Sequence, residues 1–179
     1  MTNLNFAVEK FISGKTINLR DAEIEDAQFI LNLRTDAKKA KHLNSTNADI
    51  EAQKEYLRKY KTLKNEWYFI IETKKGEPLG TIRIYDVRGD DFCWGSWIIK
   101  DGAPFDVSIE SVLLIYEYAF YKIGFNKVHF DVRKDNKTVR RFHEHFGAKQ
   151  NSEDELNVFY TFNKNDYENI KLSYQHFIA

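Results

Sequence analysis

The sequence Trp94-Gly-Ser-Trp-Ile-Ile-Lys-Asp101 opens the stretch, residues 94–147, that decides the fold of this chain. It predicts a strand, which a loop connects to an apolar helix over residues 108–123. A second strand over residues 128–132 and a second helix over residues 135–147 complete the stretch. A strand, a tight loop onto a helix N-terminus, a second strand and a short helix form a layout that can hold an elongated, phosphate-bearing cofactor.

The first of these helices carries an apolar stripe that predicts burial. Its members recur at helical spacing: Ile109, Val112, Leu113, Tyr116, Phe120 and Ile123. Gly124 is expected to end this helix. The N-terminus of the helix presents backbone N–H groups that suit a pyrophosphate. The alternative is that Asp106 or Ser108 caps the helix and that nothing binds there.

The second helix contains a histidine on its apolar face. Val139, Phe142, His143 and Phe146 fall at i, i+3, i+4 and i+7, which places them on one side of a helix. His143 is therefore the polar member of a buried stripe, whereas His145 is expected at the surface. His143 is either a hydrogen-bonded core residue or a functional group, and the helical pattern leaves both readings open.

The remaining pattern predicts a single domain of the α/β (α+β) class, with a mixed, mainly antiparallel sheet flanked by helices. Residues 1–15 are interpreted as an N-terminal leader that can add an edge element, and residues 16–179 as the domain. The further elements expected are strands over residues 16–20, 67–72, 81–86, 92–99, 148–152 and 156–163, and helices over residues 27–34, 50–60 and 166–177.

Composition excludes several classes of protein. The 179 residues include 27 basic and 27 acidic side chains, so nothing indicates binding to nucleic acid or to an anionic membrane. Cys93 is the single cysteine, which excludes an internal disulfide and a cysteine-based zinc site. No apolar run is long enough to span a bilayer and the N-terminus lacks the order of a signal peptide, so we expect a soluble cytoplasmic protein.

Several motifs, in their order and spacing, resemble the GNAT superfamily of N-acetyltransferases. They are Leu19-Arg-Asp-Ala22, Pro78-Leu-Gly80, Trp94-Gly-Ser-Trp97, Tyr118-Ala-Phe120, and Asp135-Asn136 with Phe146-Gly147. The resemblance covers roughly residues 16–163 and is nearest to the branch of ribosomal-protein N-terminal and nucleotide-amino-sugar acetyltransferases. It implies a GNAT-like domain with a β-α-β-α cofactor-binding unit.

The resemblance implies acetyl transfer from acetyl-CoA, as co-substrate and without a metal, to a primary amine. In the family, backbone groups at the positions of Trp97, Ile98 and Ile99 hold the pantetheine arm where two parallel strands splay. The loop before the long helix cradles the pyrophosphate, which implies roles for Phe105, Asp106, Val107 and Ser108. An Asn that opens the last helix commonly contacts the cofactor, which matches Asn136.

The chain departs from the family pattern at two places. The phosphate loop usually reads Arg/Gln-x-x-Gly-x-Gly/Ala, but here it reads Ala103-Pro-Phe-Asp-Val-Ser108, with an acidic side chain near the expected anion. His143 stands where many members carry a Tyr that protonates the departing thiolate. Because a thiol has a pKa of about 8.5 and an imidazolium of about 6.5, His143 is a candidate catalytic acid.

The mechanism that the resemblance implies is direct attack of the amine on the thioester, with an oxyanion stabilised by backbone N–H groups of the central strand. No covalent intermediate is expected, so Cys93 is predicted to be a small core residue. Glu72, Asp86, Asp101 and His42, acting directly or through water, are all candidate general bases. The sequence does not choose among them.

The acceptor is expected to be a small amine such as a nucleotide-linked amino sugar. The near-neutral chain lacks the acidic groove expected for a basic peptide, and residues 42–47 offer uncharged side chains suited to hydroxyl groups. Alternatives are a protein N-terminus, an antibiotic or a polyamine. A non-catalytic CoA-binding or regulatory module and a homodimer through the Tyr- and Phe-rich C-terminal elements also stay open.

Overall fold

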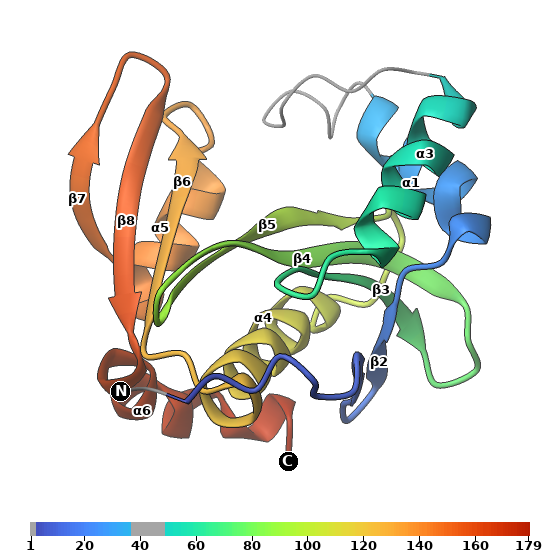
Figure 1. Cartoon of the computed structure of the whole chain (residues 1–179). Helices are drawn as coiled ribbons and strands as arrows, with labels where there is room; N and C mark the ends of the chain where they lie inside the picture. Colours follow the sequence, from blue (N-terminus) through green and yellow to red (C-terminus); the bar gives the residue numbers. More distant parts are fainter. Residues whose placement is uncertain (1–2, 37–48) are drawn as a thin grey trace.

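The fold is built on one eight-stranded sheet, seen in a computed structural model that describes residues 3–36 and 49–179 (Figure 1). The strands, in sheet order, are β1 (Phe11–Ser13), β2 (Ile17–Asp21), β3 (Trp67–Thr73), β4 (Pro78–Arg88), β5 (Asp91–Ile99), β6 (Lys127–Arg133), β8 (Asn157–Asn163) and β7 (Lys149–Glu153). Neighbouring strands are antiparallel except β5 and β6, which are parallel. The expected mixed, mainly antiparallel sheet is confirmed.

Helices cover both faces of this sheet. They are α1 (Ala27–Thr35), which follows the short 3-10 helix η1 (Ile24–Asp26), α3 (Ile50–Lys61), α4 (Val107–Glu117), α5 (Lys137–Phe146) and α6 (Lys164–Tyr174), which the 3-10 helix η3 (Gln175–Phe177) extends. Helix α4 crosses one face, whereas α1 and α3 lie together on the other side (Figure 1). The single domain therefore has two cores, one on each side of the sheet.

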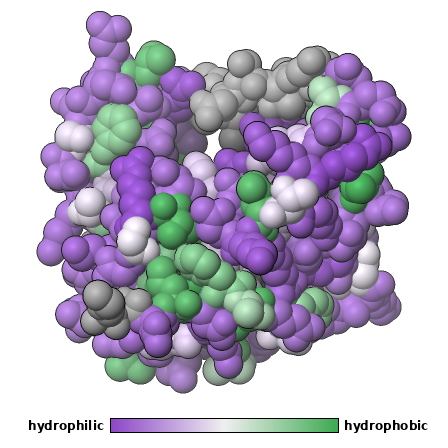
Figure 2. All heavy atoms as spheres, in the orientation of Figure 1, coloured by the Kyte–Doolittle hydropathy of each residue, from purple (hydrophilic) through white to green (hydrophobic). Residues whose placement is uncertain are grey.

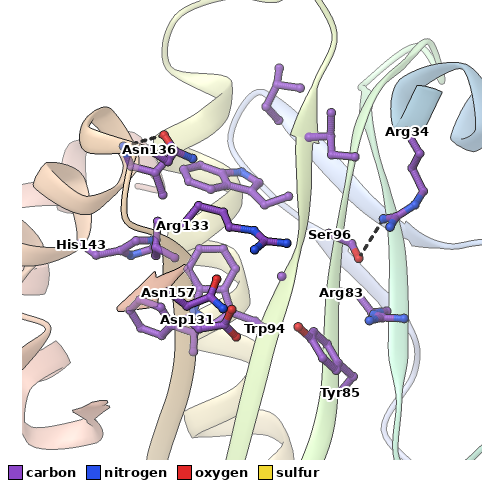
Figure 3. A pocket seen from close by; sticks show the side chains of 17 residues that line it. Arg34, Arg83, Tyr85, Trp94, Ser96, Asp131, Arg133, Asn136, His143 and Asn157 are labelled. Carbon is purple, nitrogen blue, oxygen red and sulfur yellow. Dashed lines mark hydrogen bonds between the residues drawn. The ribbon is translucent and has the colours of Figure 1, made fainter. Parts of the chain in front are cut away.

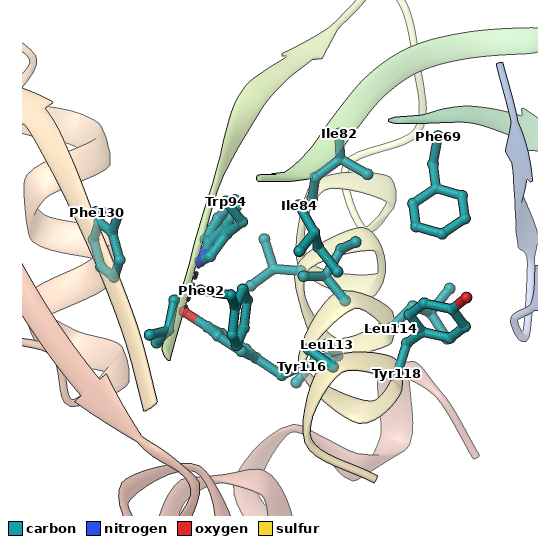
Figure 4. Close-up of a cluster of buried hydrophobic side chains, with 14 of the residues drawn as sticks. Phe69, Ile82, Ile84, Phe92, Trp94, Leu113, Leu114, Tyr116, Tyr118 and Phe130 are labelled. Atoms are coloured by element: carbon teal, nitrogen blue, oxygen red, sulfur yellow. Dashed lines mark hydrogen bonds between the residues drawn. The ribbon is translucent and has the colours of Figure 1, made fainter. Parts of the chain in front are cut away.

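The larger core lies between the sheet and α4 (Figure 4). Strand β4 alternates so that Ile82 and Ile84 are fully buried against it, and Phe69 of β3 meets the Tyr118 ring edge-on at 5.6 Å. The buried carboxylate of Glu110 in α4 accepts hydrogen bonds from the backbone N–H, at 2.8 Å, and from the hydroxyl of Thr16. These two bonds satisfy a buried polar group that would otherwise destabilise the core.

The smaller core lies under α1 and α3. Tyr68 and Ile70, the alternate residues of β3, pack there against Ile30 of α1 and Leu57 of α3. The backbone N–H of Tyr68 also donates to the Tyr60 hydroxyl at 2.9 Å. Because apolar residues occupy both faces of β3, this strand is buried on both sides and holds the two cores in one unit.

The predicted element ends are largely confirmed. Helix α3 begins after Asp49, whose side chain accepts from the Glu51 N–H at 2.9 Å, and α5 begins after Asn136. Both Gly124 (φ 104°) and Gly147 (φ 109°) end helices in the left-handed conformation that glycine adopts without strain. The long helix differs in one respect: residues Tyr118–Ile123 form a π-helix (η2), which apolar spacing does not distinguish from an α-helix.

The described part of the leader packs onto the domain. Strand β1 pairs with β2 at the sheet edge, with Ile12 opposite Leu19, and the Phe6 ring meets the Trp67 ring at 5.7 Å. The leader thus supplies the edge element that the sequence allowed. The boundary at residue 15 stays a prediction.

The surface is predominantly hydrophilic on the face shown in Figure 2, where hydrophobic residues gather mainly in the lower half of the view. Within residues 3–36 and 49–179, no helix is both long enough and apolar enough to cross a membrane.

Candidate active site

The parallel strands β5 and β6 separate after a short pairing and leave a cavity between them. They pair from Asp91 opposite Lys127 to Cys93 opposite His129, and the pairing ends there. Beyond Cys93, the β6-facing edge of β5 has no strand partner among the described residues, and a cavity of about 330 Å³ opens beside it. The backbone groups along this edge can therefore bind an extended ligand that contains amide bonds.

A bulge in β5 shapes the cavity. Between Gly95 and Ile98 the strand contains one residue more than its partner β4, and Ser96 adopts a left-handed conformation (φ 48°). The buried hydroxyl of Thr81 on β4 holds the bulge by donating to the Ser96 carbonyl oxygen at 2.7 Å. The extra residue brings Trp94 and Trp97 to the same face, with their ring centroids 5.5 Å apart.

The aromatic wall of the cavity consists of Trp94, Trp97, Phe130 and His143. The indole N–H of Trp94 donates to the Tyr116 hydroxyl at 3.1 Å, and that of Trp97 donates to the Ser111 hydroxyl at 3.2 Å. Both acceptors belong to α4, so the long buried helix sets the orientation of both indoles.

His143 is the one imidazole in this wall. Its ring centroid lies 4.4 Å from that of Phe130 and 5.3 Å from that of Trp94, and the residue is 4 % exposed. Burial lowers the pKa of His143 to about 3, because an imidazolium would lose its hydration among these rings. The ring is therefore neutral near pH 7, and the imidazolium form that the sequence argument considered is disfavoured.

The charged wall consists of Arg34 from α1, Arg83 and Tyr85 from β4, and Asp131 and Arg133 from β6 (Figure 3). Strand alternation separates the two walls, because Phe130 of β6 enters the larger core and its neighbour Asp131 points to the opposite face. The Arg83 guanidinium stacks on the Tyr85 ring, 4.0 Å from its centroid. Loss of hydration raises the pKa of Asp131, and the nearby Arg133 opposes that shift.

Five of the predicted site residues line the cavity and four do not. Trp97, Ile98, Ile99, Asn136 and His143 are brought together there. The phosphate-loop residues Phe105, Asp106, Val107 and Ser108 lie at the start of α4 and are not among the residues that line this cavity.

The phosphate-loop positions differ in their surroundings. Phe105 is 83 % exposed, whereas Val107 is buried in the larger core. Asp106 occupies the N-cap position of α4 without a capping hydrogen bond from its side chain. The backbone N–H groups of this helix start can still receive a phosphate, and the role of residues 105–108 stays a prediction.

The candidate general bases that the structure describes lie elsewhere. Glu72 is bound to Arg20 at 2.8 Å within an ion-pair cluster on β2 and β3. Asp86 pairs with Arg88 at 2.6 Å, and Asp101 lies in the turn after β5; neither lines the cavity. His42 and the rest of residues 42–47, expected to shape the acceptor pocket, fall outside the described residues.

Sequence reasoning missed Asp131, the one carboxylate among the described residues that line the cavity. The alternation Val128-His-Phe-Asp-Val132 contained a signal, since it places Asp131 on the face opposite the core. It also missed Arg34, Arg83 and Arg133, because their convergence depends on how α1, β4 and β6 come together.

The chemistry available in the cavity is that of acids, bases and hydrogen-bond donors. Cys93 is buried, and burial raises the pKa of its thiol to about 12, which disfavours a nucleophilic thiolate. In the part of the chain that the structure describes, no group of three His, Cys, Asp or Glu side chains is arranged to hold a metal ion.

Comparisons with known proteins show what this chain is similar to. Residues 16–149 match the family model described as "Acetyltransferase (GNAT) domain". The solved structure of apo FdhC, described as a nucleotide-linked sugar GNAT, is similar with 38% identity and a TM-score of 0.87, covering 96% of this chain and 100% of that one. A search of curated proteins returned no match.

More distant structures share the fold alone. A GCN5-related N-acetyltransferase from Brucella melitensis has 15% identity and a TM-score of 0.81, covering 100% of this chain and 90% of that one. A spermidine N-acetyltransferase SpeG chimera from Vibrio cholerae and hSSAT has 15% identity and a TM-score of 0.77, covering 87% of this chain and 99% of that one.

Proposed function

This chain belongs to the GNAT acetyltransferase family, and we propose that it transfers an acetyl group from acetyl-CoA to the primary amine of a nucleotide-linked amino sugar. The observation that carries the proposal is the cavity between β5 and β6, with an aromatic wall on one side and a charged wall on the other. The first wall suits an uncharged thioester arm, and the second suits a polar acceptor.

The part of β5 beyond Cys93, where the pairing with β6 ends, supports binding of the donor. The pantetheine arm of acetyl-CoA is extended and contains amide groups, so it can bind Trp97, Ile98 and Ile99 in the manner of an added strand. Asn136, at the N-terminus of α5, lines the same cavity.

Asp131 is the proposed general base. Its carboxylate takes one proton from the acceptor ammonium, and the neutral amine then attacks the thioester carbonyl carbon. The new C–N bond leaves negative charge on the carbonyl oxygen, where backbone N–H groups of β5 can stabilise it. Collapse breaks the C–S bond, and a second proton from the nitrogen goes to the departing sulfur. Free CoA, the amide and protonated Asp131 result.

His143 is the proposed partner of the departing sulfur. Because its ring is neutral, it acts as an N–H hydrogen-bond donor to the thiolate, a role that requires no imidazolium. The aromatic rings around it exclude water and strengthen that hydrogen bond. The proposed reaction thus uses a carboxylate from one wall and an imidazole from the other.

The amino-sugar acceptor is supported by the similarity to FdhC, which spans both chains at 38% identity. The fold alone supports no particular acceptor, since the SpeG chimera, a spermidine N-acetyltransferase, shares it at 15% identity.

The test has two stages. Isothermal titration calorimetry should detect acetyl-CoA binding, and absence of binding would remove the enzymatic function. Release of free CoA thiol should then be measured with a panel of nucleotide-linked amino sugars, free amino sugars, spermidine, an aminoglycoside and a peptide with a free N-terminus. Turnover is expected with a nucleotide-linked amino sugar, and turnover with the peptide or spermidine alone would overturn this acceptor.

A further inference from the structure

The charged wall carries more positive than negative charge. Arg34, Arg83 and Arg133 line it, and Asp131 is the one opposing carboxylate among the described residues that line the cavity. The chain as a whole has a formal net charge of zero, so this excess is local. A cavity with an excess of one sign of charge attracts ligands of the opposite sign.

Arg83 is the member with the clearest unmet hydrogen-bonding capacity. Its Nε atom is buried without a hydrogen-bond partner, and no described carboxylate lies within ion-pair distance of its guanidinium. The ring of Tyr85 and the hydroxyl of Tyr56 hold the group in place. A buried donor without a partner costs free energy, which an anionic ligand would recover.

Arg133 of β6 and Arg34 of α1 complete the group of three arginines around the cavity. Arg133 extends from β6 toward β5, and its guanidinium has no ion-pair partner in the part of the chain that the structure describes (Figure 3). Arg34 reaches from α1 to the same strand, where it donates to the Ser96 hydroxyl at 3.4 Å. Helix α1 and strands β4 and β6 thus each direct a guanidinium group into the cavity.

We propose that Arg83, with Arg133 and Arg34, binds a phosphate or diphosphate group of the acceptor. Guanidinium groups bind phosphate through two parallel N–H donors and remain charged at every physiological pH. The inference deepens the proposed function, because it names the part of a nucleotide-linked amino sugar that this wall recognises.

The position of Arg83 assigns the phosphate to the acceptor and not to CoA. Arg83 projects from the face of β4 opposite Ile82 and Ile84, which pack against α4 in the larger core. The helix start expected to hold the CoA pyrophosphate belongs to α4, on that other face. The same charge also opposes binding of a polyamine, because its ammonium groups would meet like charges.

The test compares two acceptors that differ only in the nucleotide. For the wild-type protein, kcat/KM is measured with the best nucleotide-linked amino sugar and with the same sugar lacking the nucleotide. Arg83→Gln is expected to lower this preference about 10- to 100-fold, since one hydrogen-bonded charged contact is worth about 1.5–3 kcal/mol. The KM for acetyl-CoA should stay within about twofold of the wild-type value.

Two controls separate the possible outcomes. Arg88→Gln removes a 66 % exposed guanidinium from the end of the same strand and should leave the preference unchanged. Calorimetry with UDP and dTDP, without acceptor or acetyl-CoA, should show binding to the wild type and at least about tenfold weaker binding to Arg83→Gln.

The proposal is overturned if Arg83→Gln lowers kcat/KM equally for both acceptors, or if it raises the KM for acetyl-CoA by the same factor. Failure of the proposed function would look different: no amino sugar would react, while the nucleotide-binding measurement would still report on Arg83. Nucleotide binding that CoA displaces would assign the arginine group to CoA and overturn the proposal.

Discussion

The two walls of the cavity share strand β6 yet present opposite chemistry. Phe130 and Asp131 are adjacent in β6, but one belongs to the aromatic wall and the other to the charged wall. Trp94 of β5 likewise belongs to the aromatic wall, whereas Arg83 of the neighbouring strand β4 belongs to the charged wall. Strand alternation thus lets a single gap between β5 and β6 offer an apolar side to one substrate and a charged side to another.

Loss of hydration acts on one titratable group in each wall, with opposite results for the pKa. It lowers the pKa of His143 to about 3 and raises the pKa of Asp131, because in each case the neutral form is favoured. His143 therefore works as an uncharged donor, whereas Asp131 becomes a stronger base than an ordinary carboxylate. The variants below test this division of roles, starting with the largest expected effect.

Asp131→Asn removes the proposed base and should lower kcat by about 100-fold or more, the range of general acid–base catalysis. The wild-type kcat/KM should fall as the pH decreases through the pKa of Asp131, above the ordinary value of about 3.9, and the variant should lose this dependence. Glu155→Gln, an exposed carboxylate beyond β7, is the control. An unchanged pH profile in Asp131→Asn would show that the base lies elsewhere.

His143→Ala should lower kcat by about 10- to 100-fold, because a hydrogen bond to a charged sulfur is worth about 1.5–3 kcal/mol. Binding of acetyl-CoA, measured by calorimetry, should persist. The control is His145→Ala, which changes an exposed imidazole on the same helix. A folded His143→Ala variant with wild-type turnover would return His143 to a purely structural role.

His143 should also make stability depend on pH. Its pKa in the folded protein, about 3, lies below the usual value, so the unfolded chain binds more protons as the pH falls from about 6.5 toward 3. Stability is therefore lost over this range, by at most about 1.4 kcal/mol per pH unit from this residue.

The variant His143→Phe should reduce that slope, since a phenyl ring suits the aromatic surroundings and takes up no proton. Urea unfolding of both proteins at pH 7.5 and pH 5 measures the difference. Equal loss of stability in the two proteins would mean that His143 is not buried as a neutral group.

Thr81→Val should have the smallest effect of these variants, because it changes only the geometry of the bulge in β5. It removes the hydroxyl that donates to the Ser96 carbonyl oxygen at 2.7 Å, a bond worth about 1 kcal/mol. The variant should bind acetyl-CoA about three- to tenfold more weakly while its acceptor KM changes little. Thr81→Ser, which keeps the hydroxyl, should behave as wild type, and equal weakening in both variants would exclude a role for the bond.

Much of the fold follows from local sequence patterns. The stripe from Ile109 to Ile123 predicts the buried helix, and Gly124 and Gly147 mark helix ends that the structure confirms. In the second stripe, His143 and Phe146 are buried, and Val139 and Phe142 are half-buried. These features depend on residues within a few positions of one another, so a sequence pattern contains the needed information.

The candidate site depends on residues far apart in the chain. Trp97, Ile98, Ile99, Asn136 and His143, which the family resemblance singled out, line one cavity, and their roles stay predictions. Sequence reasoning proposed Glu72 and Asp86 as bases because acidic side chains are recognisable, but both are held in ion pairs away from the cavity.

The sequence by itself determined the order of the elements, the apolar faces and the neutral overall charge. Only the tertiary structure decided that β5 and β6 part after Cys93, and that Arg83 and Asp131 face one cavity. The physical reason is one of range: helical and strand periodicity act between near neighbours, whereas strand pairing joins segments more than thirty residues apart.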